Sequence, residues 1–197
     1  MQLFGNSSFK ISVVKQKEAL VFFAIFLYFL EWKKVMSFFL DVNKSLISFI
    51  GAPWTLVVYM FGLKSSKNKI NLIKLRKNEN EIKIVLDKII SYLCNHIINQ
   101  IKAGADVVPI LDSMAGLIPQ KNLFNYCNEP NKKIIDFCKK NKIPVICFPR
   151  GIKENYKKFN QIVRPDGINL DYVIDPSWAK KNLKNVILQG GLDPKIL

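Results

Sequence analysis

Polar and charged side chains follow several short apolar runs of this sequence. Tyr59 and Ser113 carry hydroxyls, Asp112 and Asp171 carry carboxylates, and Arg150 carries a guanidinium. A hydroxyl can donate a hydrogen bond to a carboxylate, and a guanidinium donates several while keeping its positive charge. The two hydroxyls and the guanidinium therefore suit recognition of a substrate that carries carboxylates.

The same residues also have structural interpretations. Tyr59 could be a half-buried aromatic with a satisfied hydroxyl, Ser113 could cap a helix, and Arg150 could be a solvated surface residue. The only histidine, His96, lies beside the apolar stripe of an expected helix, and we interpret it as structural. A nucleophile paired with histidine is not expected, because His96 is far from any strand end.

Apolar runs and amphipathic segments alternate from residue 44 onward. Seven apolar residues between Ile82 and Ile101 recur at three- and four-residue steps, which predicts a long helix that ends near Gly104. The other expected elements are strands over residues 45–50, 107–111, 144–148, 167–170 and 186–188, and helices after Pro119, near Pro130, and over residues 154–161 and 176–183.

This alternation predicts an α/β fold with parallel strands and right-handed crossovers. In such folds the active site gathers at the carboxyl ends of the strands, where Tyr59, Ser113 and Arg150 are expected. The pattern leaves open whether the sheet is a barrel or a doubly wound open sheet. No glycine-rich nucleotide-binding motif follows any strand.

Composition narrows the class of partner. The 197 residues include 30 basic and 15 acidic side chains, a net charge of +15. The basic residues are mostly lysines scattered over all expected elements, without an arginine stripe, so nucleic-acid binding is not expected. No pair of the four cysteines has CxxC spacing, and we expect reduced thiols, no metal site and a cytoplasmic protein.

Three short motifs follow expected strands and carry a family resemblance. They are Gly51-Ala52-Pro53-Trp54-Thr55 with Tyr59-Met60, Asp112-Ser113-Met114-Ala115-Gly116, and Gln189-Gly190-Gly191-Leu192-Asp193-Pro194. Together they resemble the middle of the uroporphyrinogen decarboxylase family. The resemblance implies that residues 44–197 form an incomplete (β/α)8 TIM barrel, and it leaves residues 1–43 as an unmatched hydrophobic segment.

The resemblance also implies an activity. Members of this family decarboxylate the acetate side chains of uroporphyrinogen III to methyl groups, which gives coproporphyrinogen III in haem biosynthesis, without metal or cofactor. It implies that Tyr59 contacts the substrate and that Ser113 hydrogen-bonds a substrate carboxylate. Asp112 stands where the family has an acidic residue whose role is undefined, and many relatives have Lys near Arg150. Intact members are commonly homodimers.

The chief catalytic groups of the family have no counterpart in this sequence. Its RQAGRY run, the segment with its central Asp and the later segment with its His are all missing, so catalytic residues stay unassigned. We expect the chain to be inactive as it stands. The alternatives are a non-enzymatic remnant, a membrane-associated protein, or a methyltransferase of the same superfamily. The methyltransferases need a His-x-Cys pair, but Val145 stands two residues before Cys147.

The N-terminal segment contains an uncharged apolar run over residues 20–30 (LVFFAIFLYFL). A membrane-spanning helix needs about 20 apolar residues, so this run is too short by itself and a membrane location is not expected. No small-residue cleavage site follows the run, as a signal peptide would require. Three interpretations stay open: a buried core element, a membrane-associated helix, or sequence altered by a frameshift, a deletion or a misassigned start.

Overall fold

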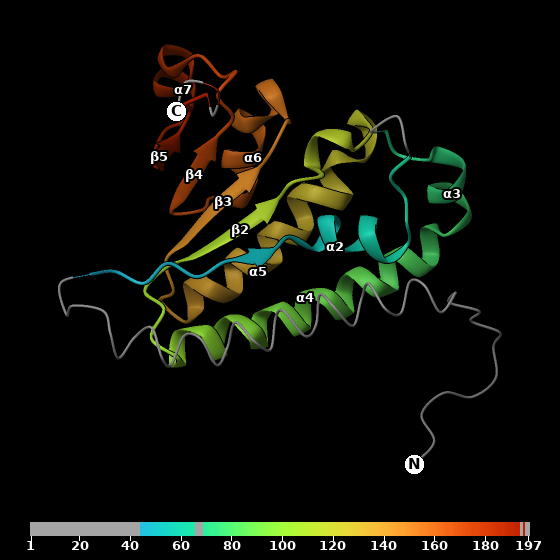
Figure 1. The fold of residues 1–197 in the computed structure, drawn as a ribbon, viewed down its shortest axis with the longest axis horizontal. Helices are drawn as coiled ribbons and strands as arrows, with labels where there is room; N and C mark the ends of the chain where they lie inside the picture. The colour runs from blue at the N-terminus through green and yellow to red at the C-terminus, as the bar shows by residue number, and fades with distance from the viewer. Residues whose placement is uncertain (1–43, 66–68, 194, 196–197) are drawn as a thin grey trace.

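Five parallel strands form the centre of the fold. The computed structural model describes residues 44–65, 69–193 and 195. The strands are β1 (Ile50–Gly51), β2 (Val108–Asp112), β3 (Val145–Pro149), β4 (Gly167–Leu170) and β5 (Ile187–Gly190). They lie side by side in the order in which they occur in the chain (Figure 1).

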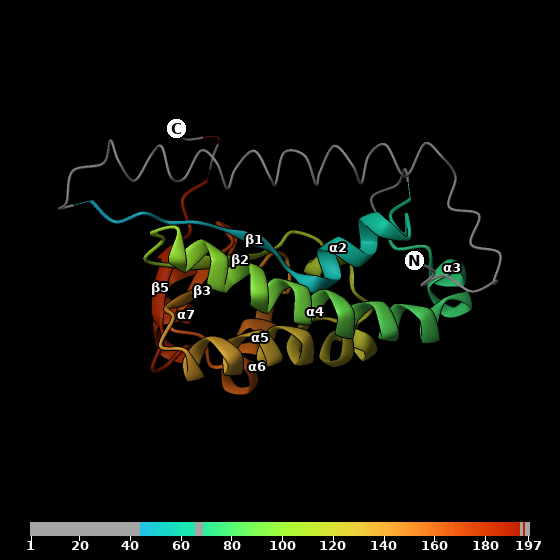
Figure 2. The same ribbon diagram turned by 90° about the horizontal axis from the view of Figure 1, so that it is seen from below.

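This strand order distinguishes between the two architectures that the sequence leaves open. A doubly wound sheet reverses its strand order at a switch point, whereas a barrel wall adds each new strand to the same edge. Here each strand pairs with the next one, and α4 (Glu79–Lys102), α5 (Glu129–Lys140) and α6 (Tyr156–Val163) lie on one side of the sheet (Figure 2). The predicted α/β fold of alternating parallel strands and helices is confirmed. Among the described residues β1 and β5 do not pair, so no closed barrel forms there.

The predicted strands are confirmed with small shifts. The run over residues 167–170 matches β4, and the runs assigned to β2, β3 and β5 differ from those strands by one or two residues at their ends. The run over residues 45–50 is the exception, because only its last residue lies in β1. Upstream of β1, Ile47 makes an isolated bridge with Val107.

The long helix is confirmed as α4. Its apolar stripe, which includes Ile82, Leu86 and Ile97, is buried, and the helix packs against α2 and α5. Gly104 follows the helix with a φ of +97°, a left-handed conformation that glycine adopts without steric cost.

Two helices were not predicted. α2 (Pro53–Met60) begins directly after β1, and Pro53 occupies its first turn, where a missing N–H has no cost. α3 (Leu72–Lys77) is capped by Asn71, whose side chain accepts a hydrogen bond from the Lys74 N–H at 3.0 Å. Both helices are short, so they show little of the periodicity that identifies α4.

The helix predicted after Pro119 is replaced by shorter elements. The chain forms the turns η1 (Ala115–Leu117) and η2 (Gln120–Asn122), and a π-helical turn, η3 (Phe124–Asn128), runs directly into α5. The remaining predicted helices are confirmed as α6, preceded by η4 (Lys153–Asn155), and α7 (Pro176–Asn182).

The hydrophobic core lies between the sheet and the helices. Trp54, Tyr156 and Phe159 are its largest fully buried side chains. None of the helices in the described ranges is both long enough and apolar enough to cross a bilayer. The apolar run over residues 20–30 lies outside these ranges.

Candidate functional site

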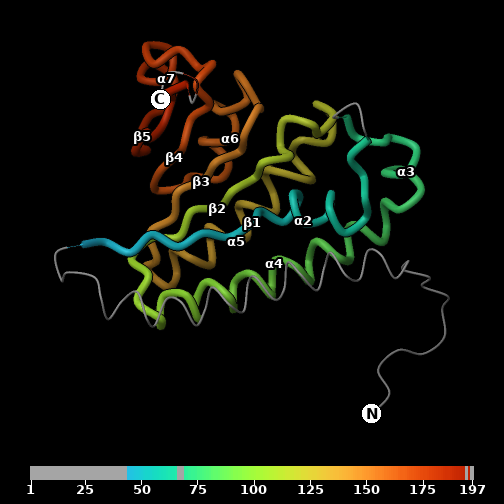
Figure 3. The backbone as a smooth tube through the Cα atoms, viewed as in Figure 1, coloured from blue at the N-terminus to red at the C-terminus, as the bar shows by residue number. Residues whose placement is uncertain are grey.

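The segments that follow the carboxyl ends of the strands form the candidate site, and we call them the rim: residues 52–63, 113–119, 150–155, 171–175 and 191–193. The segments after β1 and β2 leave the sheet on the same side (Figure 3). Tyr59 lies near the end of α2 and is 54% exposed. Ser113 is exposed directly after β2. Both hydroxyls that the sequence nominated therefore lie on the rim segments of two neighbouring strands.

Three hydrogen bonds hold the β1 and β2 rim segments together. The Thr55 hydroxyl donates to Asp112 Oδ1 at 2.7 Å and accepts from the Met114 N–H at 3.2 Å. The indole Nε1 of Trp54 donates to the Met114 carbonyl at 3.1 Å. Ser113 therefore stands between two residues that are both anchored to α2, the helix that carries Tyr59.

Asp112 itself does not face the rim. Side chains alternate along a strand, and Val108, Ile110 and Asp112 are all buried on the side of β2 that faces the helices. Asp112 is 1% exposed, and its Oδ2 has no hydrogen-bond partner among the described residues. Burial raises the pKa of this carboxyl from 3.8 to about 6, although the hydrogen bond from Thr55 opposes the shift.

A close approach of two glycines joins the β2 and β3 rim segments. The Gly116 N–H donates to the Arg150 carbonyl at 2.8 Å, and the Arg150 N–H donates to the Asp112 carbonyl at 3.2 Å. A Cβ on Gly116 would lie 2.8 Å from the Gly151 carbonyl oxygen, so a larger residue does not fit there. The backbone of Arg150 is fixed by these contacts, and the residue is exposed at the end of β3.

Asp171 joins the β3 and β4 rim segments. Its Oδ2 accepts from the Gly151 N–H at 2.6 Å and from the Tyr156 hydroxyl at 3.1 Å. Asp171 is buried, and burial together with the Asp171 charge raises the pKa of Tyr156. This carboxylate, nominated from its position after β4, therefore holds the loop of Arg150 and Gly151 in place.

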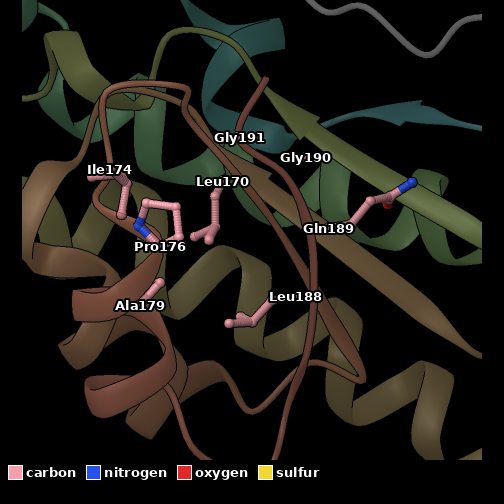
Figure 4. Close-up of a pocket in the computed structure, with 8 residues that line it drawn as sticks. All are labelled: Leu170, Ile174, Pro176, Ala179, Leu188, Gln189, Gly190 and Gly191. Carbon is pink, nitrogen blue, oxygen red and sulfur yellow. The ribbon is translucent and has the colours of Figure 1, made fainter. Parts of the chain in front are cut away.

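Close packing at the end of β5 explains why glycine stands at position 190 of the Gly190-Gly191 pair. Gly190 has a φ of +83°, and a Cβ there would lie 1.9 Å from Asn169 Oδ1 on β4. Beside this turn lies an apolar cavity of about 130 Å³ between β4, β5 and α7, shown in Figure 4. Leu188 points toward Ala179 of α7, whereas Gln189 points to the other side of the strand (Figure 4). Neither Tyr59 nor Ser113 lines this cavity.

The four cysteines and His96 are buried, and we interpret them as structural. All four cysteines are free and buried, and burial raises the pKa of the Cys127 and Cys147 thiols, which disfavours the thiolate that a nucleophile or metal ligand requires. His96 is buried with its Nε2 at 2.7 Å from Gln100 Nε2, and Gln100 Oε1 accepts from the Ser48 hydroxyl. In the part of the chain that the structure describes, no three His, Cys, Asp or Glu side chains form a group that could hold a metal ion.

Removing the Thr55 hydroxyl should weaken the joint between the β1 and β2 rim segments. In Thr55→Val the buried Asp112 carboxylate loses its donor and the Met114 N–H loses its acceptor. We expect the free energy of unfolding to fall by about 1–3 kcal/mol at pH 7, measured by urea denaturation. Thr55→Ser keeps the hydroxyl and is the matched control. Equal stability of the valine and serine variants would contradict this role.

Asp112 should make stability depend on pH. Because its folded pKa of about 6 exceeds its ordinary value of 3.8, the folded state binds the proton more tightly than the unfolded chain. The resulting stability is fully present below about pH 4 and is lost as the pH rises through 6, a loss of about 3 kcal/mol.

Urea denaturation at a series of pH values tests this dependence. Asp112→Asn should lack the loss between pH 4 and 6, whereas Asp136→Asn, at an exposed carboxyl on α5, should retain it. Parallel profiles for wild type and Asp112→Asn would show that Asp112 does not titrate in this range.

Comparisons with known proteins show which proteins this chain is similar to. The family model described as uroporphyrinogen decarboxylase matches residues 26–197, so the match includes part of the N-terminal segment as well as the whole sheet. Uroporphyrinogen decarboxylase of Orientia tsutsugamushi (strain Boryong) is 35% identical over 163 residues, which are 80% of this chain and 47% of that protein.

Two further relatives give the same result. The enzyme of Rickettsia bellii (strain RML369-C) is 37% identical over 161 residues, which are 80% of this chain and 47% of that protein. The enzyme of Wolbachia pipientis wMel is 36% identical over 167 residues, which are 84% of this chain and 48% of that protein. The chain thus spans about half the length of the curated relatives that it matches. It belongs to the uroporphyrinogen decarboxylase family.

Proposed function

We propose that residues 44–197 provide one side of the substrate-binding rim of a cytoplasmic uroporphyrinogen decarboxylase, a partial TIM barrel in which Tyr59 and Ser113 bind the carboxylates of uroporphyrinogen III. The observation that carries this proposal is the pair of exposed hydroxyls on neighbouring rim segments. Trp54 and Thr55, which belong to the first sequence motif, join these segments.

The hydrogen bonds that fix the backbone on either side of Ser113 support a role of Ser113 and Tyr59 in substrate binding. Ser113 is flanked by Asp112 and Met114, which both bond to Thr55, and Tyr59 lies one turn further along the same helix. The backbone positions that carry the two hydroxyls are therefore held before any substrate arrives, which lowers the entropic cost of binding. Arg150, exposed on the next rim segment, adds positive charge for a substrate acid.

The chemistry of the family also indicates what this chain would contribute. Protonation of a pyrrole carbon makes the ring an electron sink, and the bond to the carboxylate carbon breaks so that carbon dioxide leaves. The exocyclic methylene carbon then takes up a proton to become the methyl group, and the pyrrole carbon releases the proton that it gained, which restores the aromatic ring. Tyr59, Ser113 and Arg150 would bind and orient the substrate. No described residue is assigned to proton transfer, since Asp112 and Asp171 are buried in structural hydrogen bonds.

Binding of uroporphyrin III, the oxidised and strongly absorbing form, tests the two hydroxyls through quenching of tryptophan fluorescence. We expect Tyr59→Phe and Ser113→Ala each to weaken binding by about 2- to 10-fold, the effect of one hydrogen bond. Tyr92→Phe and Ser91→Ala, on the exposed side of α4, are matched controls. A loss of affinity in the controls equal to that in the rim variants would contradict the proposed site.

Turnover should be absent when the chain acts alone. Only three arginines occur in the sequence, and of these only Arg150 lies at the carboxyl end of a strand. A polycarboxylate transition state needs several fixed cations, each worth orders of magnitude in rate. Anaerobic incubation with uroporphyrinogen III, followed by chromatography of the products, should give no coproporphyrinogen above the rate in buffer. Turnover by the purified chain would show that it holds a complete catalytic set.

A further inference from the structure

The sheet has one covered face and one open face. α4, α5 and α6 cover the face that carries Ile110, Cys147 and Ile168, which are all buried (Figure 2). Alternation along the strands sends the intervening residues to the opposite side. We call that side the open face and define it by Leu111, Ile146, Phe148 and Ile187.

Strand register gathers these four residues into two rows. Leu111 pairs with Phe148, and Ile146 and Ile187 both align with Gly167. The Ile146 side chain covers Gly167, because a Cβ there would lie 3.0 Å from Ile146 Cγ1. Leu111, Ile146 and Phe148 are only partly buried, and Ile187 is 72% exposed. The open face therefore carries apolar side chains from β2, β3 and β5, with Gly167 of β4 between Ile146 and Ile187.

Charge sets this surface apart from the rest of the molecule. Charged residues make up 23% of the chain. None occurs at the alternate positions 109, 111, 146, 148, 167, 169, 187 and 189, which form the open side of β2 to β5. A large, uncharged apolar patch of this kind marks a surface that another element covers.

We propose that the apolar run over residues 20–30 of the same chain covers the open face. The run contains no charged residue, and the family match begins within it at residue 26. Eleven residues extend about 16 Å as a helix and more as a strand, and five strands span about 19 Å between the first and the last. Residues 31–43 lead from the run toward β1 and reach up to about 45 Å when extended, so the run can reach any strand.

Other occupants fit the same observations less well. Two copies of a chain with a net charge of +15 repel each other, which opposes a dimer through this face. A bilayer would have to accommodate Glu31, Lys33 and Lys34 directly after the run, and the run is about half of a membrane span. The inference does not depend on the decarboxylase proposal, because it concerns packing and needs no substrate.

Photocrosslinking in the full-length chain tests the proposal. The photoreactive residue p-benzoylphenylalanine replaces Phe148 on the open face or, as a matched control, Phe137 on α5, which has similar exposure on the helix side. Ile187 is a second probe position, since its high exposure tolerates a large group. Illumination is followed by a denaturing gel and by mass spectrometry of the crosslinked peptides.

We expect the probes at 148 and 187 to crosslink to residues 20–30 at monomer mass, and the probe at 137 not to do so. Adding Phe26→Lys should abolish the crosslink, whereas Phe4→Lys, outside the run, should leave it intact. Crosslinks at dimer mass would assign the face to a second copy. Retention of the chain by lipid vesicles with no crosslink to the run would assign the run to a membrane. Either result, or crosslinks only to residues outside the run, would overturn the proposal.

Discussion

The hydrogen bond between Thr55 and the buried Asp112 carboxylate is the constraint on which the rest of the site depends. This bond joins the first turn of α2 to the end of β2. The Thr55 hydroxyl also accepts a hydrogen bond from the Met114 N–H. A buried carboxylate is costly unless it is hydrogen-bonded, so the position of α2 and the charge of Asp112 are coupled. The relative placement of Tyr59 and Ser113 follows from this contact together with the hydrogen bond from Trp54 to the Met114 carbonyl.

Similar contacts continue along the rim and involve backbone as much as side chains. Gly116 packs against the backbone of Gly151, and the Gly151 N–H donates a hydrogen bond to the Asp171 carboxylate. Gly190 lies against Asn169 at the next strand. Each loop is therefore fixed by the loop beside it, which leaves exposed groups such as Ser113 and Arg150 available for a ligand. The conspicuous motif residues of this chain serve mainly to join loops.

The sequential sheet combines a well-packed face with an uncovered one. Helices bury the side of the sheet that carries Ile110 and Ile168, and the large side chains of Tyr156 and Phe159 fill the space behind it. The opposite side has the apolar composition of a core but lacks a second layer among the described residues. Covering this face would remove the most exposed apolar surface of the sheet from water, and it would add stability in proportion to the area buried.

The sequence by itself determined the α/β class, four of the five strands to within two residues, the α4 helix and the motif residues at the strand ends, because these are local patterns of polarity and turn residues. It did not predict α2 or α3, which are too short for a periodic signal. Val108, Ile110 and Asp112 stand at alternate positions of the same strand, and this spacing was a clue that Asp112 shares the buried face of the two apolar residues. Only the tertiary structure decided that Asp112 and Asp171 face inward to Thr55, Gly151 and Tyr156 while Ser113 stays exposed. Those partners lie 15 to 57 residues away in the chain, and a hydrogen bond across such a separation exists only once the strands are paired.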